Sequence, residues 1–211
     1  TVIGVVTQPD KEVGRKRILT PSPVKVCALE HGIKVFQPIK IRLDYQEIVD
    51  LQPDLIVTAA YGQIVGMKLL NSPKYRSINV HGSLLPKYRG AAPMQWALID
   101  GEEETGVTTM YMDTGLDTGD MLLKASIKLT EDDNFGTVHD KLASLGADLL
   151  VETLVKIEEG NIERVPQGES TTAYAKMITK DMTCISWEED ATTISNLIRG
   201  ITPFPKASCQ F

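Results

Sequence analysis

Two side chains that can do hydrogen-bond and acid–base chemistry, Asn79 and His81, end the apolar run INVH within residues 78–93. Side chains alternate between the two faces of a strand, so the amide and the imidazole should share one face, opposite Val80. In an open α/β sheet the carboxyl ends of strands border the ligand crevice, which predicts a binding site here. The alternative is structural: Asn79 caps a turn and His81 is a hydrogen-bonded loop histidine.

A third candidate group is the carboxylate of Asp117, in the glycine-rich loop DTGLDTGD at residues 113–120. An amide donor, an imidazole and a carboxylate suit acyl transfer to an amine, because an oxyanion needs a fixed donor and the amine must lose a proton. Asp117 would hold the imidazole and favour its charged form. Asp113 and Asp120 are rivals, since any of the three aspartates could simply form a turn.

The overall charge excludes a protein that binds nucleic acid with its whole surface. The chain has 211 residues with 22 basic and 28 acidic side chains, a net charge of -6. Any contact with nucleic acid must therefore come from a local patch. The candidate is residues 8–21 (QPDKEVGRKRILTP), predicted to be a flexible loop, where Lys11, Arg15, Lys16 and Arg17 gather. A solvated surface charge run is the alternative reading.

Alternating strands and helices predict an α/β fold with parallel βαβ units. The first strands are expected at residues 2–7, 35–36, 55–60 and 77–80, and the helices between them at 23–30, 45–51 and 65–70. Further on we expect a helix at 94–99, strands at 105–112 and 121–127 forming a hairpin, and helices capped by Asn134 and Asp190. The alternation of polar and apolar residues at 105–112 predicts a half-buried strand.

Cysteines, histidines and apolar runs narrow the protein class. The three cysteines, Cys27, Cys184 and Cys209, are odd in number and form no CxxC spacing, which is typical of reduced thiols in a cytosolic protein. The histidines are too scattered to predict a metal site. No apolar run approaches the about 18 residues of a membrane span, so we expect a soluble protein with no membrane partner. The chain begins directly on a strand-like run and ends in a loop-like one, so we expect a fragment of a longer chain.

A family resemblance rests on INVHGSLLPKYRGAAP followed by MDTGLDTGDM. Together these motifs resemble the folate-dependent formyltransferases, and within them the members that act on methionyl-tRNA. The resemblance continues through TQPDKEVGRKR, PSPVK, AAYGQI and IRGITPFP, and so covers nearly the whole chain. It implies a Rossmann-like, doubly wound, mostly parallel sheet. It also implies that Asn79, His81 and Asp117 are catalytic and that Ser83, Leu84, Leu85 and Pro86 form a turn that contacts folate.

The resemblance also implies a reaction. A formyl group would pass from 10-formyltetrahydrofolate to the α-amino group of methionine on initiator methionyl-tRNA, for translation initiation. Arg15, Lys16 and Arg17 would approach the tRNA acceptor end, where cations neutralise phosphates. No metal is implied, and we expect a monomer in the bacterial cytoplasm or an organellar matrix.

The domain organisation expected from the resemblance has two parts. Residues 1–180 would be the catalytic domain without its first strand and helix, and residues 181–211 the linker and the start of a C-terminal domain whose β-barrel is absent. Because the missing strand would be central in the sheet, we expect residues 1–211 alone to be unstable or inactive.

Two other functions remain open. A formyltransferase of the same chemistry could act on another amine, such as a sugar nucleotide or a purine-precursor ribonucleotide, although such an enzyme has no evident need for the basic stretch. A non-catalytic nucleotide- or RNA-binding module is the other alternative, although no GxGxxG or Walker loop is present.

Overall fold

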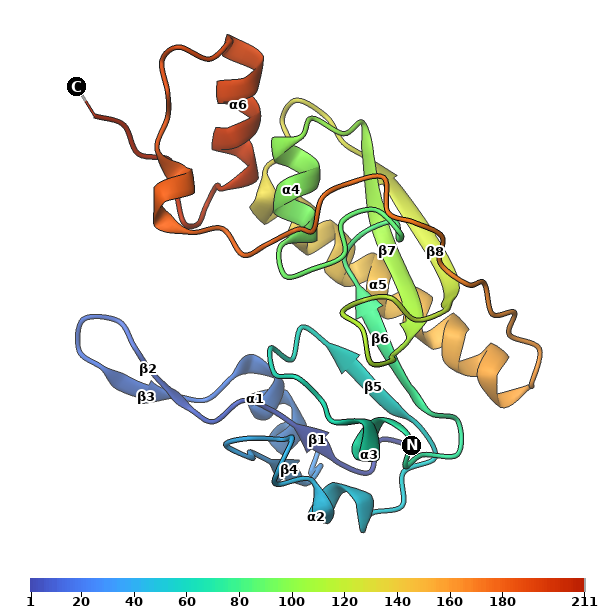
Figure 1. Ribbon diagram of the computed structural model, residues 1–211. Helices are drawn as coiled ribbons and strands as arrows, with labels where there is room; N and C mark the ends of the chain where they lie inside the picture. The colour runs from blue at the N-terminus through green and yellow to red at the C-terminus, as the bar shows by residue number, and fades with distance from the viewer. Residues whose placement is uncertain (211) are drawn as a thin grey trace. The chain divides into compact units, whose positions relative to one another are not determined.

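The computed structural model describes residues 1–210 (Figure 1). It divides into two compact units, Thr1–Ile78 and the residues from Asn79 onward, and the division falls within strand β6 (Ser77–His81). This division separates compact units of the fold. The boundary predicted near residue 180, between a catalytic domain and the linker to a C-terminal domain, stays a prediction. No helix among the described residues is long and apolar enough to cross a membrane.

The first unit holds short strands and helices in the predicted alternation. They are β1 (Val5–Val6), β2 (Lys11–Val13), β3 (Ile18–Thr20), α1 (Pro23–Glu30), β4 (Val35–Phe36), α2 (Gln46–Val49), β5 (Ile56–Ala59) and α3 (Met67–Leu70). Strands β1 and β4 pair in parallel. Helix α1 begins where the sequence predicts, because Ser22 caps it by accepting a hydrogen bond from the Lys25 backbone N–H at 3.2 Å. Phe36, Ile41, Ile48 and Leu69 form the core of this unit.

The basic stretch differs from the predicted flexible loop. Strands β2 and β3 pair antiparallel and make it a hairpin, with Val13 opposite Ile18. Gly14 and Arg17 close the turn with positive φ values of 73° and 48°, and the Arg17 N–H donates to the Gly14 carbonyl at 3.1 Å. Strands of three residues with both faces exposed leave no hydrophobic alternation in the sequence, which is why the prediction missed them.

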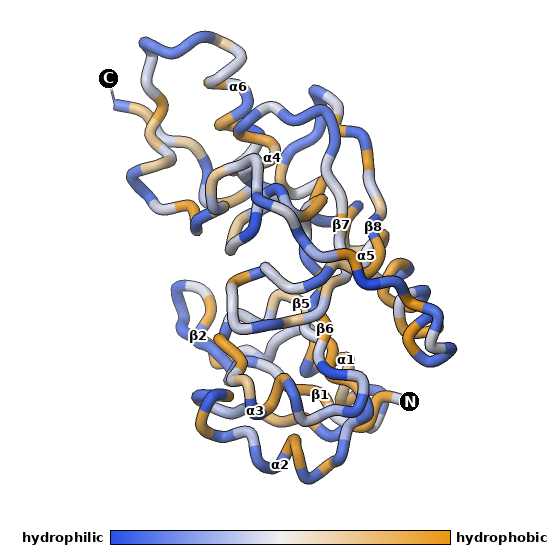
Figure 2. Tube along the Cα trace, turned by 45° about the vertical axis from the view of Figure 1, so that its right-hand side comes forward, coloured by the Kyte–Doolittle hydropathy of each residue, from blue (hydrophilic) through white to orange (hydrophobic). Residues whose placement is uncertain are grey.

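A separate four-stranded sheet has the strand order β5-β6-β7-β8, and its strands β7 and β8 belong to the second unit. After β6 come α4 (Pro93–Ile99), β7 (Glu104–Tyr111), β8 (Met121–Lys128), α5 (Phe135–Glu158), a 3-10 turn at Lys180–Thr183 and α6 (Ala191–Gly200). Strands β7 and β8 form the predicted antiparallel hairpin. Helix α5 packs against both of these strands, and hydrophobic and hydrophilic residues alternate along it (Figures 1 and 2). Its core residues are Val138, Leu142 and Leu149.

Strand β7 is buried from Thr105 to Tyr111, not half-buried as its alternation predicts. Its threonines are the reason, because their hydroxyls find partners inside the protein. Thr108 Oγ1 donates to the Ser83 carbonyl at 2.7 Å, and Thr109 Oγ1 pairs with Thr153 Oγ1 at 2.8 Å. A threonine whose hydroxyl is hydrogen-bonded and whose methyl group is packed can be buried as readily as an apolar residue.

Candidate active site

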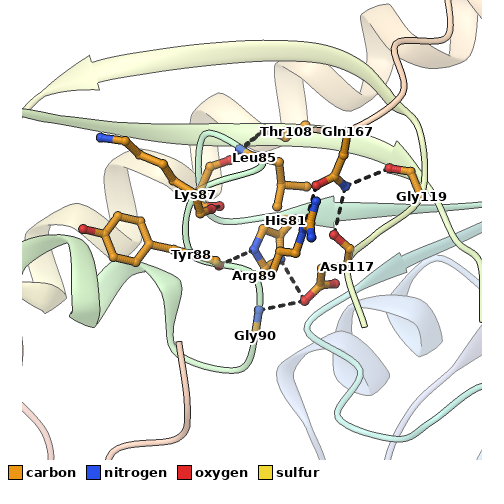
Figure 3. A network of polar contacts seen from close by, with 11 residues as sticks. His81, Leu85, Lys87, Tyr88, Arg89, Gly90, Thr108, Asp117, Gly119 and Gln167 are labelled. Atoms are coloured by element: carbon orange, nitrogen blue, oxygen red, sulfur yellow. Dashed lines mark hydrogen bonds and ion pairs between the residues drawn. The ribbon is translucent and has the colours of Figure 1, made fainter. Parts of the chain in front are cut away.

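His81, the last residue of β6, is 5% exposed and is held through one ring nitrogen. Its Nε2 lies 3.0 Å from the carbonyl oxygen of Tyr88 (Figure 3). A carbonyl only accepts, so Nε2 carries a proton in this arrangement and the ring orientation is fixed. The other nitrogen, Nδ1, is left for exchange of a proton.

Tyr88, whose carbonyl accepts that hydrogen bond, is itself held by hydrogen bonds of its side chain and its backbone. Its phenol contacts Asp100 Oδ2 at 3.0 Å and Glu102 Oε1 at 2.9 Å, and its backbone N–H donates to Thr172 Oγ1 at 2.7 Å. Burial, together with these carboxylates, raises the pKa of Tyr88 well above its usual range. The phenol therefore stays protonated, and the hydrogen bonds of its side chain and backbone hold the residue whose carbonyl contacts His81.

Asp117 faces the free side of the imidazole. Its Oδ2 lies 3.7 Å from His81 Nδ1, which is an ion-pair distance and longer than a hydrogen bond. The same oxygen accepts a hydrogen bond from the Gly90 N–H at 3.0 Å. Because Nε2 already carries a proton, a proton taken up at Nδ1 would face this carboxylate. The pair can therefore take a proton from a ligand and hold it.

The rival aspartates of the loop have other partners. Asp113 Oδ1 accepts from the Gly115 N–H at 2.9 Å and from Thr118 Oγ1 at 2.7 Å, which is the bonding of a turn former. Asp120 pairs with Arg164 at 2.7 Å. Of the three carboxylates that the sequence left open, Asp117 is the one beside the imidazole.

Asn79 lies two residues before His81 on β6 and is half-buried. Among residues 1–210 its side-chain amide has no hydrogen-bond partner. A partly accessible amide without an internal partner is available to a ligand oxygen.

The predicted folate turn presents only part of itself to a ligand. Ser83 and Leu85 are 0% exposed. The Ser83 hydroxyl donates to the Lys87 carbonyl at 2.6 Å, and the Lys124 ammonium group donates to the Leu85 carbonyl. Leu84 and Pro86 are half-buried, so theirs are the side chains of this turn that a ligand can reach.

The predicted tRNA-contacting residues Arg15, Lys16 and Arg17 lie at the turn of the β2–β3 hairpin, in the first unit, and are exposed. Arg17 pairs with Glu12 at 3.7 Å, with both side chains largely in solvent. Such a pair contributes little free energy and gives way easily to a polyanion.

The first unit also contains an open concavity of about 760 Å³. Its apolar lining comes from Ile39, Leu43 and Ile64, each with more than half of its surface exposed, and its charged lining from Lys40 and Arg42. No acidic side chain lines it, so the concavity combines apolar side chains with positive charge.

Two residues of the site were not predicted. The Gly90 backbone N–H donates a hydrogen bond to Asp117 Oδ2. A Cβ at position 90 would lie 2.6 Å from the Ala175 carbonyl oxygen, so only glycine fits there. Gln167 donates from Nε2 to the Asp117 carbonyl at 2.9 Å and to the Gly119 carbonyl at 2.8 Å (Figure 3). Gln167 lies in a polar, irregular stretch that offers no periodic signal. In the described part of the chain, no group of His, Cys, Asp and Glu side chains is arranged to hold a metal ion.

An oriented imidazole, a carboxylate beside it and an accessible amide at the end of a sheet strand are groups that can serve acid–base group transfer on an α/β fold. Sequence comparison narrows this class. The chain belongs to the formyl transferase family, since residues 1–154 match the family's formyl transferase domain and residues 177–211 match its C-terminal domain.

Individual relatives agree with this assignment. The methionyl-tRNA formyltransferase of Caldanaerobacter subterraneus subsp. tengcongensis is 54% identical over 207 residues, which cover 97% of this chain and 67% of that protein. The formyltransferase PseJ from Anoxybacillus kamchatkensis, solved with a UDP-linked formamido sugar and tetrahydrofolate, is 28% identical with a TM-score of 0.60, covering 82% of this chain and 85% of that one. A 4-N formyltransferase from Francisella tularensis has a TM-score of 0.74 at 19% identity over 88% and 76% of the two chains. These likenesses confirm the predicted Rossmann-like, mostly parallel fold.

Proposed function

We propose that this protein transfers a formyl group from 10-formyltetrahydrofolate to the α-amino group of methionine on initiator methionyl-tRNA. The observation that carries the proposal is the identity of 54% with a methionyl-tRNA formyltransferase over 97% of the chain. The solved relative bound to tetrahydrofolate supports folate as the carrier of the formyl group. We further propose that it acts as a monomer in the bacterial cytoplasm.

The site residues have distinct roles in this proposal. Asn79, whose amide has no partner among residues 1–210, donates to the formyl oxygen as negative charge develops there. His81 accepts the proton that the attacking amine loses, at Nδ1, since Nε2 is occupied by the Tyr88 carbonyl. Asp117, 3.7 Å from Nδ1, stabilises the imidazolium that results. Formyl transfer thus needs no serine or cysteine nucleophile.

The formyl donor supplies an electrophilic carbon when it is bound, and the chain offers two regions that fit folate. One is the turn at Ser83–Pro86, of which Leu84 and Pro86 are accessible. The other is the concavity with Ile39, Leu43 and Ile64 on its walls and Lys40 and Arg42 beside them. Folate combines aromatic rings with glutamate carboxylates, which match these apolar side chains and cations.

Methionyl-tRNA as the acceptor is supported by the β2–β3 hairpin. Arg15, Lys16 and Arg17 form an exposed cationic turn on a protein with a net charge of -6. Cations of this kind bind phosphates, and an enzyme that acts on a small sugar nucleotide or ribonucleotide has no evident need for three of them in a row.

The experiment that tests the proposal is a comparison of acceptors. The full-length protein is incubated with 10-formyltetrahydrofolate and, in parallel, with initiator methionyl-tRNA, uncharged initiator tRNA, a UDP-linked amino sugar or an amino ribonucleotide. We expect formyl-methionyl-tRNA to be the main product. Formylation of an amino sugar or an amino ribonucleotide, with methionyl-tRNA left unchanged, would assign the protein to another formyltransferase activity. Binding of the tRNA with no formylation in any arm would leave a binding module.

A further inference from the structure

The segment at residues 167–175 contacts Asp117 and Tyr88, the two residues that flank the His81 ring, and its first residue carries our inference. We propose that Gln167 is a positioning residue: it holds the backbone of Asp117 in the conformation that turns this carboxylate toward His81. The inference rests on the function proposed above, because it assigns a role within the same site.

The contacts of Gln167 leave its amide one orientation. Its Oε1 lies 2.9 Å from Arg89 Nε, and a guanidinium only donates, so the amide oxygen must face Arg89. Both hydrogens on Nε2 then face the loop, where they meet the carbonyls of Asp117 and Gly119 at 2.9 and 2.8 Å. Arg89 is itself tied to this segment through the Gly168 carbonyl at 2.8 Å.

The backbone of Asp117 needs such support. Its φ is +57°, in the left-handed region that side chains other than glycine rarely adopt. A conformation of this kind persists where surrounding contacts impose it. The two hydrogen bonds from Gln167 act on either side of the Asp117–Thr118–Gly119 backbone, and the Gly90 N–H holds Oδ2 at 3.0 Å. Without the Gln167 amide, Asp117 keeps the hydrogen bond from the Gly90 N–H, but its loop loses both hydrogen bonds from Gln167.

The same segment also supports the other partner of His81. Thr172 Oγ1 accepts from the backbone N–H of Tyr88 at 2.7 Å, and the Tyr88 carbonyl accepts from His81 Nε2. The Ala175 N–H donates to the Arg89 carbonyl at 2.8 Å. Figure 3 shows Gln167, Arg89 and Asp117 gathered beside the His81 ring. The segment thus links both contacts of the imidazole, and Gln167 is its link to the carboxylate.

The test replaces Gln167 by glutamate in the full-length protein. Gln167→Glu keeps an acceptor for Arg89 but removes both donors, so it detaches the Asp117 loop while the segment stays tied to Arg89. We expect kcat to fall about 100-fold, the loss typical of a misplaced catalytic group, with the KM values for methionyl-tRNA and the formyl donor changed by less than about threefold. Gln46→Glu, the same substitution on an exposed face of α2, is the matched control and should leave kcat unchanged.

Two further measurements separate positioning from a general loss of structure. Gln167→Glu combined with Asp117→Asn should be no slower than Asp117→Asn alone, because both act through one carboxylate. The ¹⁵N resonances of His81 in Gln167→Glu and in Gln167→Ala should move toward those of Asp117→Asn. Multiplicative losses in the double variant, or a His81 signal unchanged in both single variants, would overturn the inference. If the wild-type protein leaves methionyl-tRNA unformylated, the proposed function fails, while the His81 signal still decides the role of Gln167.

Discussion

His81 Nδ1 faces Asp117 Oδ2 across 3.7 Å, while Nε2 of the same ring contacts the Tyr88 carbonyl at 3.0 Å. Each nitrogen therefore has a distinct environment: one donates to a fixed acceptor, and the other can gain a proton beside a negative charge. This division leaves Nδ1 able to take up a proton, which the proposed function takes from the attacking amine.

Asp117→Asn should lower kcat for formyl transfer by about 10²–10⁴-fold, the range for loss of acid–base assistance, because the charge beside Nδ1 disappears while the shape of the side chain is kept. Single-turnover formylation of methionyl-tRNA measures the effect. The control is Asp120→Asn, which changes the same loop at a carboxylate that pairs with Arg164. Equal losses in the two variants would assign the effect to the loop and not to Asp117.

Asn79→Ala should lower kcat by about 10²–10³-fold with little change in thermal stability, since its amide has no partner to lose among residues 1–210. Asn79→Asp should be at least as slow, because it places a negative charge where the oxyanion would form. Rapid-mixing kinetics and a melting curve give both quantities. An alanine variant with wild-type kcat would remove Asn79 from the catalytic residues.

Replacement of Arg15, Lys16 and Arg17 by alanine should raise the KM for methionyl-tRNA and leave turnover of a minimal amine acceptor unchanged. Each lost phosphate contact should also reduce the dependence of log K on log[salt] by about 0.9. Binding isotherms at several salt concentrations measure this slope. The paired control is Lys128→Ala, an exposed cation at the end of β8. If the triple variant has an unchanged KM for methionyl-tRNA and an unchanged slope of log K against log[salt], the hairpin does not bind the tRNA.

Gly90→Ala should destabilise the protein by several kcal/mol, or prevent folding, because φ is +128° and the new Cβ would lie 2.6 Å from the Ala175 carbonyl oxygen. Gly168→Ala is the matched control, since nothing lies within 4 Å of a Cβ there. It should be neutral or stabilise by about 0.4–1 kcal/mol through the unfolded state. Denaturant melts compare the two variants. A Gly90→Ala protein as stable as Gly168→Ala would contradict the packing described here.

The decrease in the free energy of unfolding at acid pH should depend on Asp133. Burial opposes its ionisation, but hydrogen bonds from Lys141, Thr130 and Thr137 outweigh burial and hold the pKa of Asp133 far below its usual range. A lowered carboxyl pKa contributes stability above the unfolded value of about 3.9, and this contribution is lost as pH falls below it. Asp133→Asn should therefore flatten the rise in unfolding free energy between about pH 2 and 5, measured by denaturant melts. If the free energy of unfolding of Asp133→Asn falls as steeply with decreasing pH as that of the wild type, Asp133 is not the cause of the fall.

Features whose signals are local could be predicted from the amino-acid sequence. Ser22 before Pro23 marks the start of α1, Asn134 marks the start of α5, and the alternating strands and helices indicate the α/β class. His81 and Asp117 were predicted from residue type and motif. Such signals survive in sequence because capping and strand alternation depend on residues within a few positions of one another.

Which side chains meet in the site depends on the folded arrangement of distant segments. Asp117, and not Asp113 or Asp120, faces the imidazole, and Ser83 and Leu85 of the predicted folate turn are turned into the interior. Gln167 reaches a carbonyl 50 residues away in the chain, and Thr172 reaches Tyr88 across 84 residues. Contacts of that sequence separation follow from how loops close on each other, and no local pattern of side chains records them.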